Sequence, residues 1–141
     1  MPPNPFHLQR FVEAQAGVYS RVLEELRRGQ KQGHWMWFIF PQIQGLGASE
    51  LSRFYALTSL GEAQAYVRHP VLGPRLEECT RLVLMHAAGD LEAIFGDVDS
   101  LKFHSSMTLF ARAGCESLCR QALAAFFGGR EDANTLAQLE I

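Results

Sequence analysis

The sequence has only three cysteines among its 141 residues, no long apolar run and little net charge. An odd number of cysteines argues against a disulfide framework and favours a reducing compartment. The longest apolar run, residues 35–40, covers six positions, whereas a membrane-spanning helix needs roughly twenty. The first residues also lack the basic start and apolar core of a secretory signal. We therefore expect a cytoplasmic protein that does not cross a membrane.

The charges of the chain are nearly balanced, with 13 basic and 15 acidic residues and a formal net charge of −2. They are scattered along the sequence, so there is no cationic stripe of the kind that a nucleic-acid backbone requires. We expect no nucleic-acid polymer as a partner. One or two positive groups are nevertheless enough to hold a single nucleotide.

The sequence also offers no convincing metal site. Cys115 and Cys119 are four residues apart on one face of a predicted helix, and Cys79 and His86 are the other candidate ligands. This spacing matches no standard zinc module. We predict no metal, and because no cofactor motif is present, we predict no cofactor.

Apolar residues at helical spacing recur along most of the chain, while period-two alternation is almost absent. Gly17 divides the first helical segment into two short helices or leaves it whole. The pattern predicts an all-α single domain over residues 6–139, built as a compact bundle of about six short helices and preceded by a flexible tail, residues 1–5. The predicted helical segments cover residues 8–28, 49–57, 59–69, 74–88, 100–113, 118–127 and 132–140, with a short helical turn at 90–96.

The segment GHWMWFIFPQIQGLG, residues 33–47, holds both tryptophans and four of the fifteen aromatic side chains. As a β-strand it would have to bury both faces and pair with another strand, and the sequence offers none. We therefore predict irregular or single-turn helical structure. One interpretation makes the segment part of the core. The other makes it a pocket wall, because the indole N–H groups of Trp35 and Trp37 seek partners close to the polar side chains of His34 and Gln42.

A second candidate wall is the predicted helix around Lys102. At helical spacing Lys102 lies beside Ser105 and Ser106, next to an apolar stripe. One interpretation is a lysine whose stem covers apolar surface and serines that bond to their own helix. In the other, the charged lysine holds a phosphate or carboxylate, or the neutral lysine activates a serine.

Three further residues complete the set of candidates. His34 titrates near neutral pH and is the best candidate for a general acid or base. Asp132 follows a flexible GGR sequence and is either the N-cap of the last helix or a carboxylate carried over a pocket. Ser49 is either a plain N-cap or the start of a helix whose free N–H groups receive an anion.

Five phrases in fixed order carry a resemblance that spans about residues 6 to 139: RFVEAQAGVYSRVLEELRRG, HWMWFIFPQIQGLG, HPVLGPRLEECTRLVL, IFGDVDSLKFHSSMTLF and GREDANTLAQL. With them the chain resembles a bacterial family known as domain of unknown function 1810, which implies a compact helical domain without an established activity. The chain departs from the usual family pattern at His7, where an acidic residue is usual, and at Gly33, where a serine is common. Members are sometimes labelled calpastatin, a name of long disordered inhibitors that this apolar chain does not match.

A looser similarity of layout to the YbiA-like glycosidases implies N-glycoside chemistry. We therefore expect a domain in which Trp35 or Trp37 stacks on the ring of a nucleotide-derived small molecule. In an enzyme, His34 or Asp132 transfers the proton during hydrolysis of an N-glycosidic bond; whether the protein is an enzyme stays open. The alternative function is a protein-interaction module or a homodimerising structural domain, and the sequence does not predict the oligomeric state.

Overall fold

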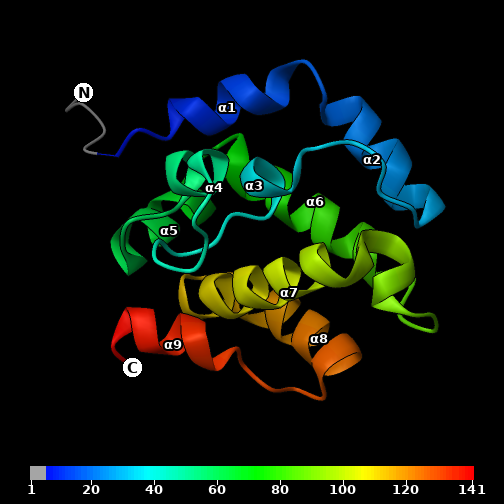
Figure 1. The fold of residues 1–141 in the computed structure, drawn as a ribbon. Helices are drawn as coiled ribbons and strands as arrows, with labels where there is room; N and C mark the ends of the chain where they lie inside the picture. The colour runs from blue at the N-terminus through cyan, green and yellow to red at the C-terminus, as the bar shows by residue number, and fades with distance from the viewer. Residues whose placement is uncertain (1–5) are drawn as a thin grey trace.

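The computed structural model describes residues 6–141, and over this range the chain forms helices and one isolated β-bridge (Figure 1). The predicted all-α architecture is confirmed, whereas the predicted flexible tail, residues 1–5, lies outside the described residues. The described part has nine helices rather than about six: α1 Gln9–Ala16, α2 Tyr19–Arg28, α3 Met36–Ile39, α4 Glu50–Tyr55, α5 Leu60–Arg68, α6 Leu72–Leu84, α7 Leu91–Arg112, α8 Glu116–Phe127 and α9 Ala133–Leu139.

The additional helices arise in two places: where the sequence was compatible with one helix or two, and where the predicted helical segment was very short. The first helical segment is broken at Gly17 into α1 and α2, and the aromatic segment contributes the single turn α3. The long helix α7 begins after the N-cap Asp90 and joins the short helical turn predicted at residues 90–96 to the helix predicted from residue 100. Within it, Gly96 has a non-helical backbone with φ of 80°, so α7 is kinked between the two helices that the sequence suggested there.

Polar caps fix the starts of several helices, because the first N–H groups of a helix have no partner inside it. The side chain of Ser59 accepts a hydrogen bond from the backbone N–H of Glu62 at the start of α5. The carboxylate of Glu62 in turn accepts from the N–H of Thr58 at 2.7 Å, one residue earlier than in a standard capping box. These short-range signals are readable in the sequence because both partners lie within one helical turn.

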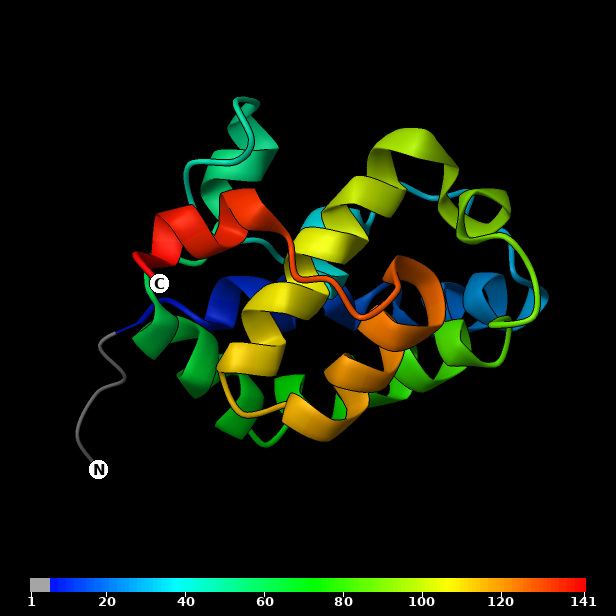
Figure 2. The ribbon, with the colours of Figure 1, turned by 90° about the horizontal axis from the view of Figure 1, so that it is seen from below.

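Helix α7 runs through the middle of the molecule and packs against α5, α8 and α9, while α6 packs against α2, α3, α5 and α8 (Figures 1 and 2). A cluster of buried phenylalanines joins the aromatic segment to α7. The ring of Phe40 lies 5.0 Å from that of Phe103 and 6.0 Å from that of Phe95, centre to centre and nearly perpendicular. Such edge-to-face pairs add to the stabilisation from burial, so this cluster anchors α3 and the loop that follows it.

The loop between α3 and α4 is tied down on two sides. The backbone of Gln42 and Gln44 bonds to Leu57, through two hydrogen bonds of 2.9 Å around the bridge between Ile43 and Leu57. At Gly45, whose φ is 98°, an added Cβ would lie 2.6 Å from the side-chain oxygen of Gln138 on α9. The missing side chain of Gly45 therefore makes room for the protein's own α9, and the loop is held between α4 and the C-terminal helix.

Candidate functional site

A cavity of about 460 Å³ lies where this loop, α4, α7 and α9 meet. Its wall combines three aromatic side chains with three glutamines from separate parts of the chain. The aromatic members come from α3, its C-terminal end and the last turn of α4, and the glutamines come from the loop and from α9. These six residues are Trp37, Phe40, Tyr55, Gln42, Gln44 and Gln138.

The charged side chains that line the cavity all have one sign. Arg53 of α4 and Lys102 of α7 line it, whereas no aspartate, glutamate or histidine is among its described lining residues. Two cations near a partly apolar wall raise the local concentration of anions. The electrostatics therefore favour a ligand that carries a phosphate or carboxylate group.

Trp37 and Lys102 meet at the wall of the cavity. The ammonium nitrogen Nζ of Lys102 lies 5.0 Å from the centre of the Trp37 ring, a distance at which a cation is attracted to the face of an indole. Trp37 is half-buried. Its indole nitrogen Nε1 is shielded from solvent and donates to no acceptor in the described chain. A buried donor without a partner is rare in native proteins and needs an explanation.

Lys102 keeps most of its hydrogen-bonding capacity. Its Nζ lies 3.7 Å from one carboxylate oxygen of Asp99, while the other oxygen of Asp99 is 2.9 Å from the Nζ of Lys31. Asp99 is therefore engaged mainly by Lys31. Because an ammonium has three N–H donors, Lys102 can bind an anion without breaking a short ion pair.

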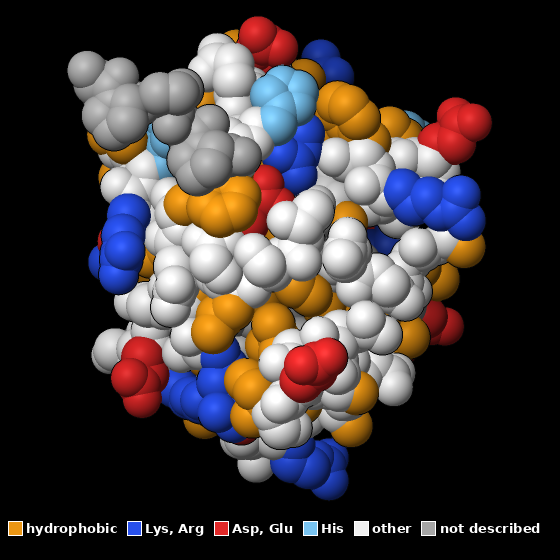
Figure 3. All heavy atoms as spheres, turned by 90° about the vertical axis from the view of Figure 1, so that its left-hand side faces the viewer, with side chains coloured by type: hydrophobic (Ala, Val, Ile, Leu, Met, Phe, Trp, Pro, Cys, Tyr) orange, Lys and Arg blue, Asp and Glu red, His pale blue; other side chains and the backbone are white. Residues whose placement is uncertain are grey.

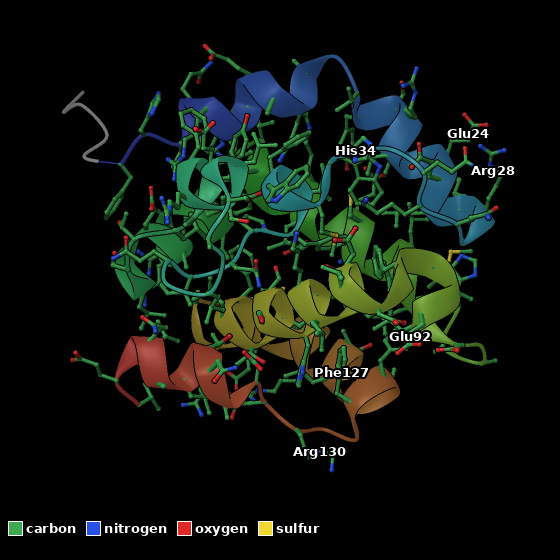
Figure 4. The ribbon with its side chains drawn as sticks, viewed as in Figure 1. Glu24, Arg28, His34, Glu92, Phe127 and Arg130 are labelled. Atoms are coloured by element: carbon green, nitrogen blue, oxygen red, sulfur yellow. The ribbon has the colours of Figure 1, made fainter. Side chains whose placement is uncertain are left out.

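Trp35 and His34 lie elsewhere, although they are neighbours of the cavity wall in sequence. The side chain of Trp35 is only 2% exposed, and its indole N–H donates to Glu25 of α2 at 2.9 Å. His34 is exposed in the segment between α2 and α3, on the side of the molecule where α2 lies (Figure 4). Neither residue lines the cavity, so Trp35 belongs to the core and His34 is not brought to the aromatic wall.

Of the other four sequence candidates, Asp132 and Ser49 cap helices, whereas Ser105 and Ser106 lie inside α7. Asp132 accepts hydrogen bonds from the backbone N–H and the hydroxyl of Thr135 at 3.0 and 2.6 Å, and from the hydroxyl of Ser105 at 3.2 Å. Ser49 caps α4, and the fully buried hydroxyl of Ser106 has no partner among the described residues. None of these four residues lines the cavity. The predicted site residues that do meet there are Trp37, Gln42 and Lys102.

Sequence reasoning missed Arg53, Tyr55 and Gln138. Arg53 and Tyr55 lie on α4, a helix of six residues without a buried side chain, and an exposed arginine on such a helix carries no special signal. Gln138 enters from α9, far away along the chain. Only the packing of α9 against α7 and the close contact at Gly45 bring it to the cavity.

The chain belongs to the family described as "protein of unknown function (DUF1810)", whose model matches residues 5–139. It is similar to the conserved hypothetical protein Rv1873 from Mycobacterium tuberculosis, whose crystal structure shares 55% sequence identity. That similarity covers 98% of this chain and 99% of the other, with a TM-score of 0.95. No curated protein matches the chain. Over residues 6–141, no helix has the length and apolarity of a membrane span, and no cluster of three side chains suits a metal ion.

Proposed function

We propose that this protein binds a nucleotide-derived small molecule in the cavity between α4, α7 and α9, with the anionic part of the ligand at Lys102. The observation that carries the proposal is the meeting of Lys102 with Trp37 at the wall of a 460 Å³ cavity, whose described lining includes two cations and no acid. The volume falls in the range of roughly 300–1,000 Å³ that small-molecule sites occupy.

The composition of the wall supports a planar ligand with polar edges. Trp37 and Tyr55 are both half-buried, so each has surface on which a ring can stack, and stacking of a base on an aromatic side chain contributes about 1–3 kcal/mol. The amides of Gln42, Gln44 and Gln138 carry both donors and acceptors, which suits the edge of a nucleobase. A phosphate would then lie within reach of Lys102 and Arg53.

Binding is better supported than hydrolysis. Cleavage of an N-glycosidic bond needs a proton donor or a carboxylate at the reacting atoms, and the described cavity wall supplies neither a histidine nor an acid. The carboxylate connected to the wall is Asp99, through its ion pair with Lys102. Incubation with NAD or ADP-ribose, followed by chromatography of the products, tests whether the bond is cleaved.

Calorimetric titration with AMP, ADP-ribose and uncharged adenosine tests the proposal. We expect binding of AMP and ADP-ribose at micromolar to millimolar concentrations and weaker binding of adenosine. Replacing Lys102 by methionine removes a charged hydrogen bond of about 1.5–3 kcal/mol and weakens AMP binding by roughly ten- to a hundredfold. No binding of any of the three compounds at millimolar concentration would overturn the proposal.

Arg130 provides a matched control for the lost positive charge. It is exposed, does not line the cavity, and its side chain extends away from the body of the molecule (Figure 4). The substitution Arg130→Gln changes the net charge by the same amount as Lys102→Met. We expect it to leave AMP binding unchanged; equal losses in both variants would mean that only the overall charge attracts the nucleotide.

A second candidate function is a protein-interaction surface on α4. Leu51 and Phe54 on this helix are 47% and 53% exposed, and α4 also carries Arg53 at the cavity. On the face seen in Figure 3, by contrast, hydrophobic side chains form separate spots among polar groups of both charges. Light scattering during size-exclusion chromatography distinguishes the two functions, because a concentration-dependent dimer that Phe54→Ser abolishes would favour the interaction surface.

A further inference from the structure

Two thiols lie in contact at the start of α8, and neither of them lines the proposed nucleotide cavity. The sulfur atoms of Cys115 and Cys119 are 2.8 Å apart, with the Cys119 thiol donating to the sulfur of Cys115. An S–S bond is about 2.05 Å long. The sulfurs therefore need to approach by only about 0.8 Å to bond, well within the reach of a side-chain rotation.

The local backbone explains this proximity. Side chains four residues apart in a regular helix have Cβ atoms about 5–6 Å apart, which is longer than the usual Cβ separation of about 3.5–4.5 Å in a disulfide. Cys115, however, precedes the helix, with a non-helical φ of −95° and ψ of 45°. It follows Gly114, whose φ of 119° is readily available only to glycine. This turn directs the chain so that the two thiols meet.

Cys115 is the less buried of the two thiols, with 6% of its surface exposed. Cys115 lines an open depression of about 580 Å³ between α6 and the start of α8, together with Arg81 and Gln121. Cys119, by contrast, is fully buried. A small reagent can therefore reach Cys115 first and Cys119 only through it.

The chemistry of the pair distinguishes an attacking thiol from a resolving thiol. The hydrogen bond from Cys119 lowers the pKa of the Cys115 thiol below its usual value, against the opposing effect of burial. The same contact and burial raise the pKa of Cys119. Free N–H groups at the start of the twelve-residue helix α8 also stabilise a thiolate at the N-cap.

We propose that Cys115 and Cys119 form a peroxide-reactive dithiol site that closes to an intramolecular disulfide. The Cys115 thiolate attacks one oxygen of a hydroperoxide, so that the O–O bond breaks, an S–O bond forms, and the departing oxygen takes a proton to leave as water or an alcohol. The Cys119 sulfur then attacks the sulfenic sulfur of Cys115. The S–S bond forms, the S–O bond breaks, and the hydroxide leaves as water with the Cys119 proton; the peroxide is reduced by the two electrons that the thiols lose.

Cys79 is an internal control within the same chain. It is fully buried and lines neither the depression nor the nucleotide cavity. Burial raises the pKa of its thiol to about 12, so little thiolate is present near neutral pH. A reagent that oxidises thiols without regard to their surroundings would modify Cys79 as well.

Peptide mapping after treatment with hydrogen peroxide tests the site directly. Trypsin releases both cysteines in one peptide, residues 113–120, and Cys79 in another, residues 76–81. We expect the first peptide to lose two hydrogens in mass and to lose its reaction with N-ethylmaleimide, both reversibly with dithiothreitol. The reaction should be about tenfold or more faster in the folded protein than in the same protein unfolded in guanidinium, because the fold supplies both contact and activation. An equal or slower rate in the folded protein would overturn the proposal.

Single substitutions separate the two roles. The Cys119→Ser variant should accumulate sulfenic acid on Cys115 that dimedone traps, while the Cys115→Ser variant should leave Cys119 unmodified on the same timescale. Circular dichroism confirms that each variant is folded, and the alanine variants replace any serine variant that is not. Similar oxidation of both single variants, or oxidation of Cys79 as fast as that of Cys115, would exclude a built dithiol site. AMP binding is measured separately, so failure of this proposal and failure of the nucleotide proposal are distinguishable.

Discussion

Trp35 and Trp37 are two residues apart and have opposite surroundings. The Trp35 ring is buried in the core, and the carboxylate of Glu25 accepts its indole N–H together with the backbone N–H groups of Gln32 and Gly33, all at 2.7–2.9 Å. Trp37 is half-buried at a cavity and its indole N–H has no acceptor within the described residues. The indole N–H of Trp35 is therefore used within the fold, whereas the indole N–H of Trp37 has no partner among the described residues.

Under the proposed function, the two similar side chains divide between stability and binding. A residue whose hydrogen bonds are all made within the protein contributes to folding, and a ligand gains nothing from it. A residue at a cavity wall with an unused donor and a cation at its face contributes less to folding and more to recognition. The following predictions test this division, from the largest expected effect to the smallest.

Truncation of the two rings should separate them most clearly. Trp35→Ala removes a fully buried aromatic side chain and should lower the free energy of unfolding by about 3–5 kcal/mol. Trp37→Ala removes a half-buried ring beside a space that already exists and should lower it by about 1–2 kcal/mol. Urea denaturation at pH 7 measures both. Equal losses would mean that Trp37 is as much a part of the core as Trp35.

Phenylalanine substitutions isolate the indole N–H from the ring. Trp35→Phe removes one of the three donors of the Glu25 carboxylate and should destabilise the protein by about 1.5–3 kcal/mol, the contribution of a hydrogen bond to a charged group. Trp37→Phe removes a donor without a partner and should change the free energy of unfolding by about 0.5 kcal/mol or less. A large loss for Trp37→Phe would reveal an acceptor for its indole within the protein.

The Glu25 carboxylate, which accepts the indole N–H of Trp35, makes the stability of the fold depend on pH. Burial by itself would raise the pKa of Glu25, but the N–H donors of Gly33, Gln32 and Trp35 outweigh it and hold the pKa below its usual value. A carboxyl whose pKa is lower in the folded state stabilises the protein above its unfolded pKa of about 4.3. This stabilisation is lost as the pH falls through the folded-state pKa.

The pH dependence is measured by urea denaturation between pH 7 and pH 3 for the wild type and for Glu25→Gln. We expect the wild type to lose more stability on acidification than the variant, because glutamine does not titrate. The other carboxyl groups contribute equally to both proteins, so the difference between the two curves belongs to Glu25. Parallel curves would contradict its role as the anionic acceptor of Trp35.

Lys102 should have the smallest effect on folding. Its ion pair with Asp99 is long, and its side chain is 21% exposed, so Lys102→Met should change the free energy of unfolding by about 0.5 kcal/mol or less. Lys31→Met, which removes the 2.9 Å partner of Asp99 with a side chain only 10% exposed, should destabilise more, by about 1 kcal/mol or more. A larger loss for Lys102 than for Lys31 would place Lys102 among the residues that hold the fold together.

Several parts of the fold were predictable because their causes are local. The helix-ending glycine at position 29 adopts φ of 73°, and Asp132 caps α9 by a contact over three residues. For the aromatic segment the sequence predicted irregular or single-turn helical structure, because a strand there had no partner, and the single turn α3 forms. The glycine end of α2 and the aspartate cap of α9 each depend on residues within about one helical turn.

The surroundings of the two tryptophans were not predictable. In a single helical turn, two residues separated by one other point in nearly opposite directions, and four residues are too few to show which direction is the core. The answer depends on Glu25 from α2 and Lys102 from α7. Neither residue stands out in the sequence by its spacing from the tryptophans.

The sequence by itself determined an all-helical domain with an aromatic turn, because helical periodicity and capping act between residues close together in the chain. The tertiary structure alone decided which tryptophan is buried, that Gln138 and Arg53 reach the same cavity as Lys102, and which of the two paired thiols lines a surface depression. Those outcomes follow from the packing of helices distant in sequence, where burial and hydrogen-bond partners are assigned by proximity in space.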